Sequence, residues 1–219
     1  MLIVIGDVLD RHEVAAIREV AAELEFRDGK ATAGRFARNV KQNAQAKPSR
    51  ALKAVLEKVE QALMSNPTFV SAARPRHFTS LLMSRYGGGQ AYGSHVDDAL
   101  MTGGRTDLSF TLFLTDEDAY EGGELVIEDP LEDRAIRLRP GDLVLYPSNT
   151  LHRVAPVTSG ERLAIVGWVT SWVRDPARRE VLFDLDQCVA EAWEKDGKSP
   201  HFDRLAKTRS NLLRMWAEG

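Results

Sequence analysis

Two histidines and an aspartate in the middle of the chain are the residues whose types and spacing could do chemistry. The stretch RYGGGQAYGSHVDDALM, residues 85–101, places His95 and Asp97 two positions apart, directly after a loop with three consecutive glycines. In a strand, side chains at positions i and i+2 point to the same side, so this imidazole and this carboxylate can converge on one point. The pair therefore suggests a metal site.

A third candidate ligand, His152, follows in the stretch YPSNTLHRVAPV, at the start of a predicted strand after a Pro-Ser-Asn turn. Two imidazoles and one carboxylate form the facial triad of non-haem iron(II) oxygenases, which leaves metal positions open for a co-substrate and dioxygen. Each residue alone also has a simpler interpretation. A histidine beside an aspartate in a loop is often a surface pair, and a lone histidine is often a partly buried core residue.

Arg162 opens the apolar strand RLAIVGWV, ten positions after His152. An unpaired guanidinium inside a β core is costly, so a buried Arg162 requires an anion. A dicarboxylate such as 2-oxoglutarate would supply one, by chelating the metal at its keto acid end and pairing its distal carboxylate with the arginine. The alternative is an Arg162 exposed beside Glu161 at a turn, and spacing alone does not choose between the two.

Taken together, His95, Asp97, His152 and Arg162 resemble the His-x-Asp…His…Arg signature of the iron(II)/2-oxoglutarate-dependent dioxygenases. The resemblance implies a double-stranded β-helix, with Fe(2+) bound by the triad and 2-oxoglutarate anchored by Arg162. It also implies L-ascorbate as the reductant of oxidised iron, a hydroxylation reaction, and no catalytic residue beyond the metal site.

The upstream loop resembles the prolyl 4-hydroxylase branch of these enzymes. Tyr86, Gly89 and Tyr92 continue into the His-x-Asp pair with the spacing Tyr-x-x-Gly-x-x-Tyr-x-x-His-x-Asp. Tyr86 matches a tyrosine that can hydrogen-bond the co-substrate, although aromatic core packing is an equal alternative. A second tyrosine of the animal oxygen-sensing hydroxylases is replaced by Phe113, and Thr111 is a candidate substitute.

Within this branch, the β core followed by a short helical region resembles the bacterial PKHD-type hydroxylases. That resemblance implies an association with iron uptake and leaves the substrate undefined, so a small molecule and a peptidyl residue both remain open. A non-catalytic cupin-like metal-binding or sensing protein, and a zinc hydrolase using the same ligands, are the rival hypotheses. Neither rival needs a buried arginine near the metal.

The elements that must position these residues begin with the stretch MLIVIGDVLD, which we interpret as a first strand and not a signal peptide. Asp10 and Glu13 predict a capping box for a helix over RHEVAAIREVAAEL, and SRALKAVLEKVEQALMSN predicts a second amphipathic helix. Between them, residues 26–45 predict a turn and short strand, or a loop near the site. From residue 78 to residue 172, short runs rich in β-formers predict a jelly roll with flanking helices.

The C-terminal part predicts a helical hairpin. Asp175 is an N-cap with Pro176 at the first helical position, Gly197 ends that helix, and a last helix runs to Trp216. We therefore divide the chain into a dioxygenase domain, residues 1–174, and a C-terminal helical region, residues 175–219. The apolar residues of this region predict packing on the core or on another subunit, and we expect a homo-oligomer. A third hypothesis treats the β core as a scaffold and assigns the function to this helical region.

Composition narrows the remaining functions. The 219 residues carry a net charge of -3 without a basic face, which argues against a nucleic-acid partner, and no segment is apolar enough for a membrane span. The single cysteine, Cys188, is expected to be a half-buried structural thiol in a cytoplasmic protein. Residues 98–107 predict a mobile flap or an ordinary loop, in which Arg105, like Arg85, either meets an anionic substrate or is solvated.

Overall fold

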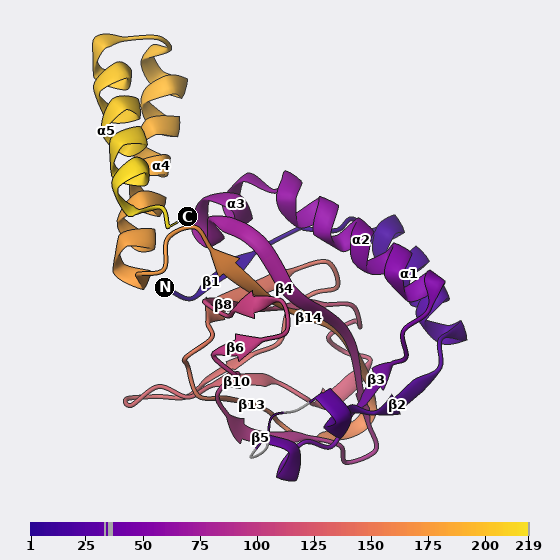
Figure 1. Ribbon diagram of the computed structural model, residues 1–219. Coiled ribbons are helices and arrows are strands. Elements are labelled where there is room, and N and C mark those ends of the chain that lie inside the picture. Colours follow the sequence, from indigo (N-terminus) through magenta and orange to yellow (C-terminus); the bar gives the residue numbers. More distant parts are fainter. Residues whose placement is uncertain (33, 35–36, 219) are drawn as a thin grey trace.

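The computed structural model describes residues 1–32, 34 and 37–218 (Figure 1). Two antiparallel sheets form the core of the described chain, three helices lie along one side, and a helical hairpin projects from one end. This arrangement confirms the predicted jelly roll with flanking helices and a C-terminal helical hairpin. None of the helices in these residues is both long and apolar enough to cross a membrane.

The larger sheet contains the two longest strands of the fold. Its strands are β1 (Ile3–Ile5), β2 (Phe26–Asp28), β3 (Ala44–Ala46), β4 (Pro75–Gly87), β8 (Leu108–Phe113), β9 (Tyr120–Gly122), β12 (Leu143–Pro147) and β14 (Val157–Ser171). They are ordered β1-β12-β8-β14-β4-β3-β2, and β9 pairs with β14 beside this path. Arg162 on β14 lies directly opposite Tyr86 on β4, so these two side chains share one face of the sheet.

The smaller sheet carries the histidines. Its strands are β5 (Tyr92–His95), β10 (Leu125–Ile127), β11 (Arg134–Ile136) and β13 (His152–Val154), in the order β11-β10-β13-β5. A separate two-stranded hairpin is formed by β6 (Leu100–Met101) and β7 (Gly104–Arg105), inside the segment for which the sequence predicts only a flap or a loop. Two-residue strands are too short to show an alternating pattern in the sequence.

Three helices pack along the larger sheet: α1 (Arg11–Glu23), α2 (Arg50–Ser65) and α3 (Pro67–Ala73). The predicted capping box of α1 is present. The Asp10 side chain accepts a hydrogen bond from the Glu13 backbone N–H, and the Glu13 side chain accepts one from the Asp10 backbone N–H. Phe69 of α3 stacks on Phe78 and meets Phe110 edge-on, each at 6.0 Å, which fixes α3 to β4 and β8. α3 is not predicted as a separate helix, because Asn66 both ends α2 and caps α3.

The C-terminal hairpin consists of α4 (Pro176–Asp196) and α5 (Pro200–Trp216), with the predicted N-cap at Asp175 and Gly197 at the C-cap. It extends away from the sheets (Figure 1) and contacts the core mainly through α3. An ion pair between the buried Arg74 and the partly buried Asp186 makes this attachment. Cys188 is exposed on α4, so the expectation of a half-buried thiol is wrong.

The polar segment between residues 26 and 45 contains β2, β3 and two short 3-10 helices, η1 (Gly29–Thr32) and η2 (Ala37–Asn39). The predicted turn and short strand are therefore present in part, while residues 33 and 35–36 lie outside the described residues. β3 pairs with β4 at the end of the larger sheet, and an isolated bridge joins Lys41 to Tyr92 of β5. This segment thus lies beside both sheets near the histidines.

Candidate metal centre

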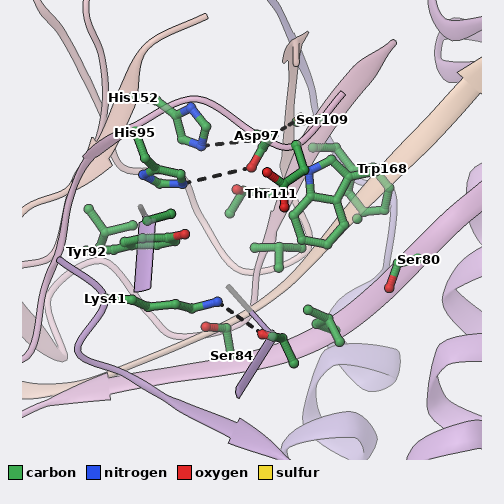
Figure 2. A pocket seen from close by; sticks show the side chains of 18 of the residues that line it. Lys41, Ser80, Ser84, Tyr92, His95, Asp97, Ser109, Thr111, His152 and Trp168 are labelled. Carbon is green, nitrogen blue, oxygen red and sulfur yellow. Dashed lines mark hydrogen bonds and ion pairs between the residues drawn. The ribbon is translucent and has the colours of Figure 1, made fainter. Parts of the chain in front are cut away.

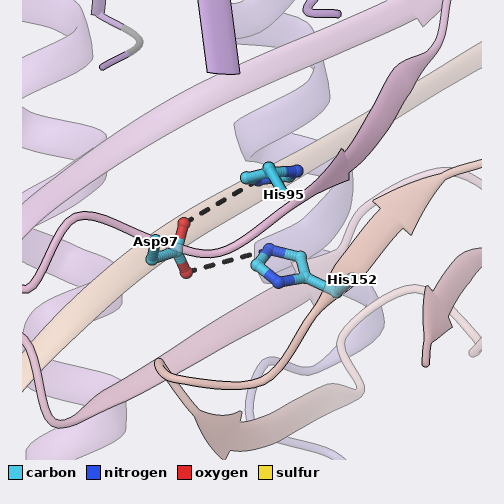
Figure 3. A group of neighbouring side chains, drawn as sticks. All are labelled: His95, Asp97 and His152. Carbon is cyan, nitrogen blue, oxygen red and sulfur yellow. Dashed lines mark ion pairs between the residues drawn. The ribbon is translucent and has the colours of Figure 1, made fainter. Parts of the chain in front are cut away.

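His95, Asp97 and His152 meet at one end of the smaller sheet (Figure 3). His95 is the last residue of β5 and His152 the first of β13, and the two positions are paired across these strands. Asp97 lies beyond the end of β5, so the expectation that one strand carries both His95 and Asp97 is wrong. The chain instead bends after His95 and returns the carboxylate to the two imidazoles.

Each histidine is oriented by a carbonyl two residues before it. The Nδ1 atom of His95 lies 2.9 Å from the Gly93 carbonyl oxygen, and that of His152 lies 3.0 Å from the Thr150 carbonyl oxygen. A carbonyl only accepts, so Nδ1 carries the proton in both rings and Nε2 is left with a free lone pair. Both Nε2 atoms face Asp97 (Figure 3).

The triad leaves a gap between its ligand atoms. The Nε2 atoms of His95 and His152 lie 3.9 and 3.8 Å from the carboxylate oxygens of Asp97, beyond hydrogen-bond range. All three candidate ligand atoms lie within 4.8 Å of one another. Because metal–ligand bonds to nitrogen and oxygen are about 2.1 Å long, one ion can contact all three atoms after small adjustments. This donor set fits iron(II).

Electrostatics keep His95 in the form that binds a metal. Burial, followed by the neighbouring His152, lowers the pKa of His95 to about 4. The imidazole is therefore neutral at pH 7 and needs to lose no proton when a cation binds.

One hydroxyl group holds the carboxylate, and a second contacts that hydroxyl. Ser109 on β8 donates a 2.6 Å hydrogen bond to Oδ2 of Asp97, and its oxygen lies 2.8 Å from that of Ser148. Both serines are buried. Neither serine is predicted as a site residue, although the alternation in LSFTLF places Ser109 on the same face of β8 as Thr111.

Arg162 is 1% exposed, so the alternative of an exposed side chain beside Glu161 is wrong. Its guanidinium carbon lies 5.5 Å from the Tyr86 ring and 5.1 Å from the Phe113 ring. Glu161 pairs with Arg85 instead, and Nε of Arg162 has no hydrogen-bond partner within the described residues. A buried cation without a counter-ion is expensive, which is the condition under which an anion is needed.

One cavity of about 450 Å³ is lined by both the triad and this arginine; Figure 2 shows the triad side of it. Tyr86 and Thr111 both line it, whereas Phe113 packs in the core behind Arg162. Tyr146 on β12 also lines it and was missed from the sequence; burial raises its pKa well above the usual value, so its phenol stays protonated. The co-substrate candidates Tyr86 and Thr111 are therefore both within the cavity.

The segment after Asp97 covers part of the cavity. Leu100, Met101 and Thr102, in and after β6, line it. Arg105 on β7 points elsewhere, because it pairs with Asp107 at 2.7 Å and with Glu218 at 3.3 Å. Neither Arg105 nor Arg85 lines the cavity, so the suggestion that they meet a substrate finds no support in this geometry.

Solved structures share this fold at low sequence identity. A prolyl-4-hydroxylase from Pseudomonas putida is 20% identical with a TM-score of 0.54, the alignment covering 78% of this chain and 92% of that one. HygX from Streptomyces hygroscopicus, solved with nickel and 2-oxoglutarate bound, is 13% identical with a TM-score of 0.59, covering 78% and 84%. At these identities the likeness concerns the fold.

Matches at the level of sequence identify the family. Residues 81–170 match the 2OG-Fe(II) oxygenase superfamily, and residues 176–218 match the PKHD-type hydroxylase C-terminal domain. A PKHD-type hydroxylase of Maricaulis maris is 50% identical over 218 residues, and one of Synechococcus elongatus is 52% identical over 223 residues, both with full coverage of each chain. This chain therefore belongs to the PKHD-type hydroxylases, enzymes of the iron(II)- and 2-oxoglutarate-dependent oxygenase superfamily.

Proposed function

We propose that His95, Asp97 and His152 hold the iron of this dioxygenase and that Arg162 binds the distal carboxylate of 2-oxoglutarate. The observation that carries the proposal is the buried guanidinium, which has no carboxylate partner among the described residues and lines the same cavity as the triad. A cupin-like metal-binding or sensing protein, or a zinc hydrolase, has no use for such a group. No feature of the site favours either rival.

When bound, iron(II) and 2-oxoglutarate together activate dioxygen and hydroxylate the substrate, with succinate and carbon dioxide as by-products. The chain's own residues bind and orient. Gly93 and Thr150 carbonyls direct the two imidazoles, Ser109 directs the carboxylate, and Arg162 fixes the far end of the co-substrate. The surrounding buried side chains exclude water from this reaction.

The remaining co-substrate contact is assigned to Tyr86, which lies opposite Arg162 across β4 and β14. Thr111 is the competing candidate, because it lines the same cavity from β8. Tyr86→Phe and Thr111→Val each remove one hydroxyl and keep the shape nearly constant. The variant with the larger rise in the 2-oxoglutarate dissociation constant identifies the partner.

The test is an anaerobic titration of the apoprotein with iron(II) and 2-oxoglutarate, followed by the visible metal-to-ligand band of the chelate. Two charge-assisted bonds to a carboxylate predict a roughly hundredfold weaker 2-oxoglutarate affinity in Arg162→Ala. Arg162→Lys keeps the charge and guards against a folding defect. Arg85→Ala is the matched control, since Arg85 is near by in the sheet but pairs with Glu161.

The outcomes are distinct. A visible band that appears only when both iron(II) and 2-oxoglutarate are added, and that is lost in His95→Ala, supports the assignment of the metal ligands. If Arg162→Ala binds 2-oxoglutarate as tightly as wild type, the anchor lies elsewhere. Iron binding without any band, in wild type, would refute the assignment of this cavity to the co-substrate.

The same proposal includes the domain division, the reductant, the cellular location and a link to iron uptake. The dioxygenase domain is residues 1–174 and the helical region 175–219, in line with the two family matches. L-ascorbate as the reductant rests on the family resemblance, and a cytoplasmic location rests on the single cysteine. A role in iron uptake rests on the family resemblance, and impaired growth of a deletion strain specifically under iron limitation would test it.

We also propose a homo-oligomer that uses the C-terminal hairpin. Val181, Trp193 and Met215 are large apolar side chains exposed on α4 and α5. Light scattering of the full chain should give a multiple of the 24.4 kDa monomer mass. A single monomeric species at micromolar concentration contradicts this proposal and leaves the active-site assignment untouched.

A further inference from the structure

A second buried cation faces the cavity from the segment that precedes β3. Lys41 and Asn43 alternate along this segment and Gln45 follows within β3, so in an extended chain their side chains share one side. They are 5%, 4% and 2% exposed, and all three line the cavity. A row of buried polar side chains on a cavity wall is unusual unless each has a partner.

The ammonium group of Lys41 is held by neutral groups. Its Nζ lies 3.2 Å from the hydroxyl oxygen of Thr32 and 5.0 Å from the centre of the Tyr92 ring, and Thr32 in turn donates to Gln45 at 2.6 Å. No ion pair within the described residues includes Lys41, and the acceptor oxygen of Asn43 is buried without a partner. The wall therefore presents one uncompensated positive charge.

Lys41 is also close to the candidate metal centre. Figure 2 shows Tyr92 between Lys41 and His95. The centres of the Tyr92 and His95 rings are 3.6 Å apart, and Nζ of Lys41 lies 5.0 Å from the Tyr92 ring centre. The sum of these two distances sets an upper limit of 8.6 Å between Nζ and the His95 ring centre. A group bound at Lys41 would thus lie in the same cavity as the candidate metal centre.

Charge balance indicates what binds there. In the cavity, Arg162 and Lys41 are positive, Asp97 is negative and the metal adds two positive charges; Asp98 also lines the cavity but is exposed to water. The two carboxylates of 2-oxoglutarate are used by the metal and by Arg162. One buried positive charge remains, and it is the one on Lys41.

We propose that Lys41, with Thr32 beside it, is the substrate-anchoring subsite and that the substrate is a small molecule carrying a single carboxylate. The inference rests on the proposed function, because it takes Arg162 and the triad as the co-substrate site. A monoanion matches the single charge of Lys41. The cavity of about 450 Å³ also holds the co-substrate, so the anchored part is small.

The rim fits an apolar continuation of such an acid. Leu100 and Val96 are exposed and line the cavity with Met101. A neutral peptide substrate would be held mainly through its backbone and would leave the Lys41 ammonium without a counter-ion. Burial lowers the pKa of Lys41 to about 8, opposed by Asp97 and Asp28, so the group is still mainly charged at pH 7.

The experiment uses manganese(II) in place of iron, with saturating 2-oxoglutarate and no turnover. The probes are acetate and butyrate, compared with acetamide and butyramide, and the readout is the paramagnetic relaxation of their methyl protons. One charge-assisted contact predicts roughly tenfold stronger enhancement for each acid than for its amide. Butyrate should exceed acetate because of the apolar rim.

The variants separate the explanations. Lys41→Met keeps the apolar stem and should abolish the preference for acids, whereas Lys47→Met, at an exposed lysine paired with Glu25, should keep it. Enhancement that persists in Lys41→Met would mean that the acids bind the metal, and it overturns the proposal. Equal enhancement by acids and amides in wild type overturns it without any variant.

Co-substrate binding is measured first in each protein. If wild type binds manganese but not 2-oxoglutarate, the proposed function fails, and this is seen before any probe is added. If Lys41→Met weakens 2-oxoglutarate binding as much as Arg162→Ala does, Lys41 belongs to the co-substrate site and the proposed substrate subsite is refuted. Unchanged 2-oxoglutarate affinity together with lost acid preference supports it.

Discussion

Ser109 offers a sharp test of how the metal centre is built, because it touches a candidate ligand and lies outside the triad. Its hydroxyl donates 2.6 Å to Oδ2 of Asp97, while Oδ1 faces His95 at 3.9 Å. Ser109→Ala removes this donor and little volume. The carboxylate is then free to rotate, and it must be fixed again when the metal binds.

The expected loss follows from the strength of that bond. A hydrogen bond to a charged group is worth about 1.5–3 kcal/mol, and outer-shell partners of metal ligands typically change affinity about 10- to 100-fold. We therefore expect manganese(II) to bind Ser109→Ala about 10- to 100-fold more weakly than wild type. Manganese is suitable because it is stable in air and its free ion is counted directly by electron paramagnetic resonance.

Ser148→Ala is the matched control. Ser148 contacts the Ser109 hydroxyl at 2.8 Å and, within the described residues, makes no hydrogen bond to Asp97. Removal of its hydroxyl should therefore weaken metal binding by a few-fold at most. Circular dichroism and thermal melting show whether each variant is folded. Wild-type affinity in folded Ser109→Ala would refute the reasoning, since Ser109 would then only satisfy a buried carboxylate without positioning it.

Two further predictions concern the apoprotein. Burial lowers the pKa of His95 to about 4 from 6.5, so between these pH values the unfolded chain binds a proton that the folded chain does not. The free energy of unfolding should therefore fall by about 3 kcal/mol as the pH drops from 6.5 to 4. Urea denaturation of wild type and His95→Phe measures this, and an equal dependence on pH in both proteins would exclude His95 as the cause. Asp186→Ala leaves the buried Arg74 unpaired and should lower the free energy of unfolding by about 3–5 kcal/mol. Arg209→Ala, at the outer side of the same carboxylate, should lower it by about 0.5 kcal/mol. Similar losses in the two variants would mean that burial does not determine the strength of these ion pairs.

The sequence was most informative where a local pattern dictates a local structure. The capping box at Asp10, the Asp175-Pro176 helix start and the glycine stop at Gly197 are all present, because each depends on a few neighbouring residues. The alternating strands and the turn before His152 are local features too. Residues with this kind of signal could be placed from the sequence alone.

Contacts between distant segments left no such signal. Ser109 and Asp97 are 12 positions apart, and the hydroxyl contact between Ser109 and Ser148 spans 39. Lys41 lies in a polar segment that predicts a turn and a short strand, or a loop near the site, and its role depends on the bridge to Tyr92. These residues become visible once strand pairing has brought their segments together.

The C-terminal hairpin is tied to the site by a second, weaker link. Glu218 pairs with Arg105 on β7, and the Glu218 N–H donates to the Trp172 carbonyl oxygen. This ion pair is partly exposed, so it contributes little to stability. Its consequence is geometric, since β7 pairs with β6, and β6 lines the cavity. The buried Arg74–Asp186 pair therefore attaches the hairpin, whereas the Arg105–Glu218 pair connects the chain end to the cover of the cavity.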